Sequence, residues 1–537
     1  MIPDFVFWNS DHFSAEQRND LSAKGAISLP EPRVLNLLLQ SYIDFVHPQL
    51  PFLDLSRFLS VVGSNGQSSH LSLLLVQAVL FAGALYIDFE DRLFTQYGNS
   101  RDLQIKLRAR SKVLYEAGYE KDRLNLVQAS MLLSLENYID FEVSDESQFW
   151  LDVCLINFEE WKGSQPDEEI WNSPSVRLRW SLYVVNNTMN FRRGKSGPGT
   201  FQSHEVGFPS LSRFDTLINA KQTLLNLKSS GLLRQPYLQK LLAEMFIHRL
   251  RLQRIISRIT EEAAEIGLGR ITTRESMEME GSHCRLDLAK VFSKWDSELD
   301  KWWCGLPDYA SDLKSAFHFD DSTSIRLLSF HLAVTATEFF SICNAIYSFL
   351  TEVEDSSSFW VISVKHKQSM NSAKLLHIIS GMDERDMHRY LLNHGLNIVE
   401  WALQRRLSSS HLSTNSKDIA KVLSLTKKLL DIRTNLGRDN HSLTRFMKST
   451  AQNLRTAEES PPKDTVINAD QENSTDARID SPCSALLSST EASIPSETPS
   501  CYANMTEDLD PLFASCDGYT LVEDLMSPSI DVEWLKT

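Results

Sequence analysis

The run Arg192-Arg193-Gly194-Lys195-Ser196 has the side chains best suited to phosphate chemistry in this sequence. It ends like a phosphate-binding loop, in which backbone N–H groups and a lysine hold the phosphates. It lacks the earlier glycine of that motif, and it follows a predicted helix where the motif requires a strand. The better interpretation is a surface loop.

Thiol and imidazole chemistry is also sparse. The chain has seven cysteines, an odd number, at wide spacings and without any Cys-x-x-Cys pair. The adjacent pair His283-Cys284 has no second pair to complete a zinc site. Cys154 lies in the apolar run 151–158 and is expected to be an inert core thiol. We therefore expect no metal site and no disulfide framework, and reduced thiols typical of the cytosol or nucleus.

No motif for a catalytic site is present. The sequence contains no His-Glu-x-x-His, no Gly-x-Ser-x-Gly and no Gly-x-Gly-x-x-Gly. Trp302, Trp303 and the aromatic-rich segment Phe339–Phe349 are expected to pack in a core, with contact to a small ligand as the alternative. We expect no enzyme and no cofactor.

Two basic segments could contact nucleic acid. One lies within 101–112, and the other is the stripe Arg249, Arg251, Arg254 and Arg258. The favoured interpretation for both is an ordinary solvated helix face, because long arginines can cover apolar surface while their charged ends stay in water.

The strongest functional signal lies at the C-terminal end. Residues 451–537 carry four Lys or Arg against seventeen Asp or Glu, so most of the formal net charge of −16 lies there. Residues 451–504 are rich in Ser, Thr, Pro and acids, and we expect a disordered spacer. Residues 505–537 interleave acids with large apolar side chains, which a merely solubilising tail does not need. The candidate partner-binding residues are Leu509, Leu512, Phe513, Tyr519, Leu521, Leu525, Met526 and Trp534.

Apolar residues recur at three- and four-residue steps through most of the first 450 residues, which predicts an all-α fold with little sheet. We expect an N-terminal segment at 1–30 and one large multi-helix regulatory domain at 31–450. Asp54 and Asp122 are expected to cap helices. The predicted helices include 34–45, 71–87, 101–117, 176–191, 211–262 (a pair), 284–304, 324–352, 359–382, 386–406 and 416–435.

The segment Leu71–Ile87 is uncharged and apolar enough to raise the question of a membrane span. At about 1.5 Å per residue it would barely cross about 30 Å of hydrocarbon, and no basic residues flank it. A buried core helix is the favoured interpretation. The N-terminus carries Asp4 and lacks a basic start, so no secretory signal is expected.

Several pieces of the first 210 residues resemble a known family in order and spacing. They are Lys24-Gly-Ala-Ile-Ser-Leu-Pro30, Leu38-Leu-Gln-Ser-Tyr-Ile-Asp-Phe-Val-His-Pro48, Leu50-Pro-Phe-Leu-Asp54, Leu75-Val-Gln-Ala-Val-Leu-Phe-Ala-Gly-Ala84, Ala109-Arg-Ser-Lys-Val-Leu-Tyr115, Tyr119-Glu-Lys-Asp-Arg123, Leu126-Val-Gln-Ala129, Phe149-Trp-Leu151 and Arg177-Leu-Arg-Trp180. Together they resemble the fungal-specific transcription factor domain. This is the all-helical middle homology region of fungal zinc-cluster regulators, here closest to the cutinase transcription factor type.

The sequence departs from that family in two places. Asn186-Asn187 stand where relatives usually carry an Asp-Arg pair. Zinc-cluster regulators also read DNA through six closely spaced cysteines upstream of this domain, and no cysteine precedes Cys154 here. Since thiolates are the zinc ligands, direct DNA binding is unsupported by these residues.

The resemblance implies a fungal transcription regulator of a nutrient or secondary-metabolite pathway, acting in the nucleus, with 505–537 as an activation segment. Its partners would be the transcription machinery or co-regulators, a DNA-binding partner regulator, or a second copy of this chain. One alternative is an adaptor or inhibitor that titrates partner regulators without binding DNA. Another is a helical module that senses a small molecule. We expect no membrane partner.

Overall fold

The structure is a computed structural model, and it is all-α apart from one short strand pair. The described residues belong to one unit, Met1–Pro461. They are 3–8, 12–67, 69–87, 100–137, 145–164, 173–192, 209, 211, 214, 232–233, 235–265, 288–307, 323–353 and 359–384. The helices expected at 386–406 and 416–435, most of the segment 211–231 and the whole acidic tail lie outside these residues.

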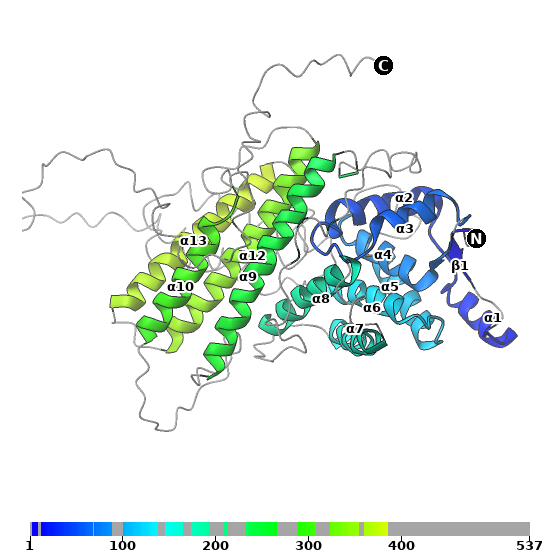
Figure 1. Ribbon diagram of the computed structural model, residues 1–537, viewed down its shortest axis with the longest axis horizontal. Coiled ribbons are helices and arrows are strands. Elements are labelled where there is room, and N and C mark those ends of the chain that lie inside the picture. The colour runs from blue at the N-terminus through cyan, green and yellow to red at the C-terminus, as the bar shows by residue number, and fades with distance from the viewer. Residues whose placement is uncertain are drawn as a thin grey trace, which may run out of the picture. The chain divides into compact units, whose positions relative to one another are not determined.

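Helices account for nearly every element (Figure 1). In chain order the elements are β1 (Val6–Phe7), α1 (Ala15–Ala23), α2 (Pro32–Ser41), the π-helical turn η2 (Tyr42–Val46), α3 (Leu55–Gly63), β2 (Leu71–Ser72), α4 (Leu73–Ala84), α5 (Ser100–Glu116), α6 (Arg123–Leu133), the 3-10 turn η4 (Ser134–Asn137), α7 (Asp145–Ser164), α8 (Ser173–Arg192), α9 (Pro236–Glu265), α10 (Leu288–Cys304), α12 (Thr323–Val353) and α13 (Phe359–Glu384).

Helix α4 is the centre of the N-terminal helices. Every residue in it is buried, and it packs against α2, α5 and α6. Ser72 caps the helix by accepting a hydrogen bond from Leu75 N, so α4 begins at Leu73, two residues after the start of the apolar run. The buried Gln77 donates to the carbonyl of Ala26 at 2.6 Å. Each fully buried Leu or Val side chain here contributes about 1.5–3 kcal/mol.

Helix α4 is thus a core helix, as the composition and flanks of the segment 71–87 indicate, although residues 71 and 72 form strand β2 and the helix ends at Ala84. Within the described part of the chain, no helix is long and apolar enough to cross a membrane.

Local signals account for the helix starts. Asp54 accepts from Arg57 N at the start of α3, and Asp122 accepts from Asn125 N at the start of α6, as predicted. Ser14 and Gln17 form a reciprocal capping box at the start of α1.

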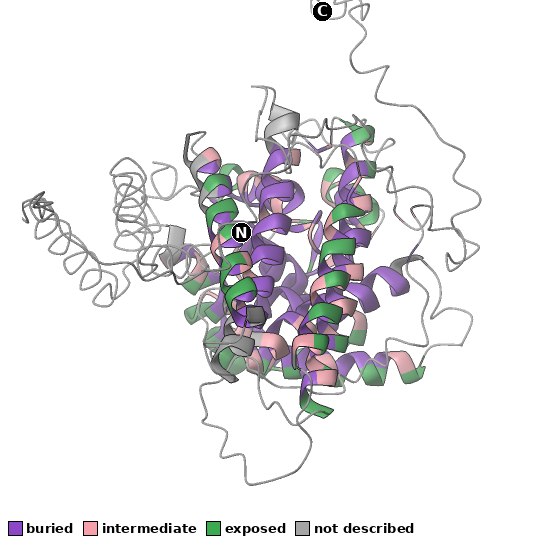
Figure 2. Ribbon diagram, turned by 90° about the vertical axis from the view of Figure 1, so that its left-hand side faces the viewer, coloured by how far each residue is buried: buried purple, intermediate pink, exposed green. Residues whose placement is uncertain are grey.

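The helices α9, α10, α12 and α13 lie side by side (Figure 1). Their buried residues form a single hydrophobic cluster with those of the N-terminal helices. Figure 2 shows buried residues on the inner faces of the helices and exposed residues on the outer faces.

Helices α2 and α4 approach each other at Gly83. A Cβ atom at this position would lie 2.1 Å from the carbonyl oxygen of Leu38, which no side chain can tolerate without moving a backbone. The same contact lets the hydroxyl of Ser41 donate to the carbonyl of Gly83 at 2.7 Å. Glycine is therefore required here by the spacing between two helices.

We expect Gly83→Ala to lower the free energy of unfolding by about 3 kcal/mol, because the two helices must separate. Gly163→Ala is the matched control, since nothing lies within 4 Å of a Cβ atom there. That change should stabilise the protein by up to about 1 kcal/mol. Urea denaturation of the full chain measures both, and equal effects of the two substitutions would contradict the close approach.

Candidate functional site

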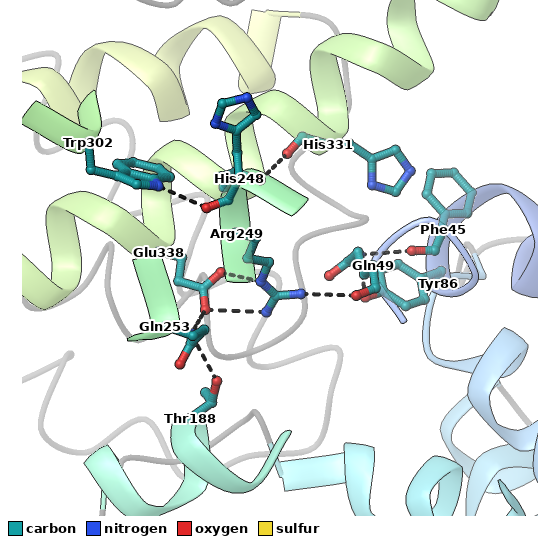
Figure 3. A network of polar contacts seen from close by, with 11 residues as sticks. Phe45, Gln49, Tyr86, Thr188, His248, Arg249, Gln253, Trp302, His331 and Glu338 are labelled. Carbon is teal, nitrogen blue, oxygen red and sulfur yellow. Dashed lines mark hydrogen bonds and ion pairs between the residues drawn. The ribbon is translucent and has the colours of Figure 1, made fainter. Parts of the chain in front are cut away.

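The residues proposed from sequence as a partner-binding surface, from Leu509 to Trp534, lie outside the described residues. The described part of the chain offers a different candidate, a buried polar network at the junction between the N-terminal helices and the α9–α13 helices (Figure 3). Seven of its side chains come from η2, the segment after it, α8, α9 and α12: Asp44, Gln49, Thr188, Arg249, Gln253, His331 and Glu338.

The network begins where the helix of 32–46 ends. Its last turn is π-helical, with His47 N donating to the carbonyl of Tyr42. Pro48 has no N–H, so it cannot donate to the carbonyl of Asp44 four residues earlier. The imidazole of His331, on α12, takes that place with Nε2 2.8 Å from the Asp44 oxygen. A residue 287 positions away in sequence thus caps the turn.

Because a carbonyl oxygen only accepts, His331 Nε2 must carry the proton. The pKa of His331 is lowered to about 4, mainly by burial; the bond to Asp44 opposes this shift, and the positive charge of Arg249 adds to it. The imidazole is therefore neutral at pH 7.

The side chain of Asp44 extends the same contact. It is 8% exposed, and its Oδ1 accepts from the backbone N–H of Leu232 at 3.3 Å. Asp44 in the π-helical turn thus binds Leu232 through its side chain and His331 on α12 through its backbone carbonyl oxygen.

Gln49 connects the turn to helix α9. Its Nε2 donates to the carbonyl of Phe45 at 2.8 Å and to the hydroxyl of Tyr86 at 3.1 Å. The backbone carbonyl of Gln49 accepts a hydrogen bond from Nη1 of Arg249 at 3.3 Å. Gln49 therefore caps the carbonyl of Phe45 at the end of the π-helical turn with its side chain, and binds the guanidinium of Arg249 on α9 with its backbone.

Arg249 and Glu338 form the charged centre of the network. Arg249 Nε lies 2.7 Å from Oε2 of Glu338, and Nη2 lies 3.2 Å from Oε1, so the pair is bidentate. Both side chains are 9% exposed. Gln253 donates to Glu338 Oε1 at 2.9 Å and to the hydroxyl of Thr188 on α8 at 3.3 Å. The pair thus joins α8, α9, α12 and the segment after η2.

Near the network, Trp302 and Trp303 pack against aromatic rings of α12. Trp302 donates from Nε1 to the carbonyl of His248 at 2.8 Å and stacks on Phe339. Trp303 also stacks on Phe339, and its ring makes a tilted contact with Phe340. Trp302 thus lies in the core, and the partly buried Trp303 packs against it, in agreement with the predicted core packing.

The hollow beside the network, lined in part by Gln49, Arg249 and His331, measures about 20 Å³. That is room for about one water molecule, not a substrate. Among the described residues, no group of three or more His, Cys, Asp or Glu could hold a metal ion. The geometry is suited to joining helices.

The two basic segments differ from the expectation of simple solvated faces. Arg249 is buried in the ion pair, although Arg258 does follow the expectation and pairs with Glu298 at the surface. Arg108 is 3% exposed and donates to the carbonyl of Leu133, because the tight packing of α5 against its neighbours encloses it. Lys106 is exposed.

Cys154 is an inert core thiol, as predicted. It donates to the carbonyl of Val127, and burial raises its pKa to about 12. Cys284 and residues 193–196 of the phosphate-loop-like run lie outside the described residues.

Comparison with known protein families gives a match that runs from the end of α2 into α7. Residues 39–154 match the model of the fungal specific transcription factor domain. This part of the chain is similar to a fungal-specific transcription factor domain. The matched residues include η2 and Gln49, so the domain supplies one side of the network, and α8, α9 and α12 supply the other.

The relatives of the chain are transcription factors. Transcription factor cpaR of Aspergillus oryzae is 28% identical over 57% of this chain and 51% of its own length. Cutinase transcription factor 1 beta of Fusarium vanettenii is 27% identical over 57% of this chain and 36% of its own. Fusaric acid cluster transcription factor FUB12 of Gibberella moniliformis is 26% identical over 24% of this chain and 19% of its own.

The chain thus spans about half the length of such curated relatives, or less. Their names point to a regulator of transcription rather than to an enzyme. No solved structure matches the chain significantly.

Removing one partner of the buried pair should be costly. We expect Arg249→Met or Glu338→Leu alone to lower the free energy of unfolding by about 3–5 kcal/mol, because the remaining charge is buried without its partner. The double variant should recover most of that loss, since neither charge then remains.

Arg258→Met is the matched control on the same helix, where the pair with Glu298 is half exposed and contributes about 1 kcal/mol or less. Urea denaturation of the four variants measures the differences. Single variants no worse than Arg258→Met, or a double variant whose loss is the sum of the singles, would contradict this account of the network.

Proposed function

We propose that this protein is a fungal transcription regulator in which the helical body is the regulatory part and residues 505–537 are an activation segment. The observation that carries the proposal is the match of residues 39–154 to the fungal specific transcription factor domain, together with relatives that are named transcription factors. Its site of action would be the nucleus.

The helical body supports this role because it is built as one packed unit. The hydrophobic cluster runs from Phe5 to Met382, and the polar network ties the matched domain to the helices that follow it. Such a body can transmit a change at one surface to another only if its helices are coupled by fixed contacts. Arg249 and Glu338 supply such a contact.

The pathway is proposed from the relatives alone. One is named for the fusaric acid cluster, another for cutinase, and another as an acetamidase regulatory protein. We propose that this chain likewise controls genes of a secondary-metabolite or nutrient-use pathway. Promoter contact would come through a DNA-binding partner regulator or through residues outside this sequence.

The acidic C-terminal segment would contact the transcription machinery or a co-regulator. Acids repel one another and keep such a segment extended, and its bulky apolar residues then remain available to a partner groove. In this scheme Phe513, Leu525 and Trp534 are anchors, and residues 451–504 are the spacer.

A reporter assay tests the tail directly. Residues 451–537 fused to a heterologous DNA-binding domain should activate transcription, whereas residues 451–504 alone should not. Replacing Leu512, Phe513, Leu525 and Trp534 by Ala should lower the output at least about tenfold, because anchor residues carry most of the binding energy.

The matched control replaces the apolar spacer residues Val466, Leu486 and Leu487 by Ala, and it should leave the output unchanged. A silent fusion of 451–537 would overturn the activation role and favour an adaptor that titrates partner regulators. Full output from the four-residue variant would overturn the proposed anchors.

A further inference from the structure

A second hollow, of about 320 Å³, lies at the N-terminal end of the described helices. Strand β1 and strand β2 form one side of it, and the turn between α5 and α6 forms another. Its lining includes Phe7, His12, His70, Tyr119 and Lys121. The volume lies in the range of small-molecule sites, which usually start at about 300 Å³.

The walls of this N-terminal hollow are held by fixed contacts. Val6 and Phe7 pair in parallel with Leu71 and Ser72. The hydroxyl of Tyr119 donates to the carbonyl of Phe7 and accepts from the N–H of Leu73 at 3.2 Å. Strand pairing and the hydrogen bonds of Tyr119 therefore fix the walls of the hollow in place.

A helix end positions Tyr119. Gly118 has a φ of +65°, in the left-handed region, and this conformation ends α5 and turns the chain back. The N–H of Tyr119 then bonds the carbonyl of Leu114 at 3.1 Å, and the N–H of Gly118 bonds that of Tyr115 at 2.9 Å. This geometry directs the next residues toward β1.

Aromatic rings give the hollow an apolar wall. Trp8 stacks on both Phe13 and Tyr119, with ring centroids 5.7 Å apart in each pair. The ring of Phe7 is 51% exposed and meets the imidazole of His70 edge to face. An exposed phenylalanine beside a cavity is a surface on which a flat apolar group can pack.

The polar groups of the lining favour an acidic ligand. Glu120, its only carboxylate among the described residues, already accepts from the N–H groups of Lys121 and Asp122 and from the amide of Asn125. The groups of the lining that can carry a positive charge are Lys121, His12 and His70, all of which can donate hydrogen bonds. A carboxylate would receive charge-assisted hydrogen bonds from them.

We propose that this hollow binds a small aromatic carboxylic acid, with its ring against Phe7 and Tyr119 and its carboxylate toward Lys121. The site is independent of the proposed role in transcription, and it lies in the part of the chain that borders the start of α4. Ligand contact with Tyr119 would reach α4 through the bond from Leu73.

Fluorine NMR of the full chain with 4-fluorobenzoate tests the site. We expect saturable line broadening with a dissociation constant on the order of 1 mM, typical of a ligand of this size. The amine 4-fluorobenzylammonium, with the opposite charge on the same ring, should bind at least about tenfold more weakly.

Two variants locate the site. Lys121→Gln should weaken benzoate binding about tenfold, whereas Lys240→Gln, the same change at an exposed position on α9, should have no effect. Phe7→Ala should weaken it at least about threefold, whereas Tyr237→Ala, at a similarly exposed aromatic residue, should not. No broadening up to about 10 mM benzoate, tighter binding of the amine, or equal binding by Lys121→Gln and Lys240→Gln would each overturn the proposal.

Discussion

A carboxylate and a guanidinium buried together constrain this protein more than any other contact that the structure describes. Glu338 alone in the core would cost several kcal/mol, and so would Arg249. They can be buried only when α9 and α12 lie in the one register that brings both atom pairs within hydrogen-bond distance. Shifting either helix by one turn along its axis would leave both charges buried without a partner. The pair thus fixes register, which hydrophobic packing alone leaves loosely defined.

The same guanidinium reaches beyond the two helices. Its remaining nitrogen binds the carbonyl of Gln49, just after the π-helical turn of the matched domain. His331, two turns before Glu338 on α12, caps the Asp44 carbonyl, to which Pro48 cannot donate. Helix α12 therefore holds the domain at two points. The segment that matches the fungal-specific transcription factor domain and the helices after it are in this way built as one body, as the proposed regulatory role requires.

The parts of the fold that could be predicted from sequence are those determined by residues within a few positions of one another. The capping aspartates Asp54 and Asp122 act within one turn, and the apolar run of α4 is buried whatever its neighbours. The π-helical turn, the two-residue parallel ladder and the network were not predicted, because each depends on residues far apart in sequence. Arg249 and Glu338 are 89 positions apart, and nothing local says which arginine of the stripe is buried. One signal was present: Glu338 is the only acid in the apolar run 327–347, where an acid needs a partner.

Hydrogen–deuterium exchange of the full chain with Glu338→Gln tests most directly whether the network makes the domain and the later helices one unit. Glu298→Gln, which removes the acid of the surface pair, is the control. We expect Glu338→Gln to speed exchange in Tyr42–Val46 as well as in α9 and α12, by a similar factor, with little change in the control. Faster exchange confined to α9 and α12, with Tyr42–Val46 unaffected, would contradict it.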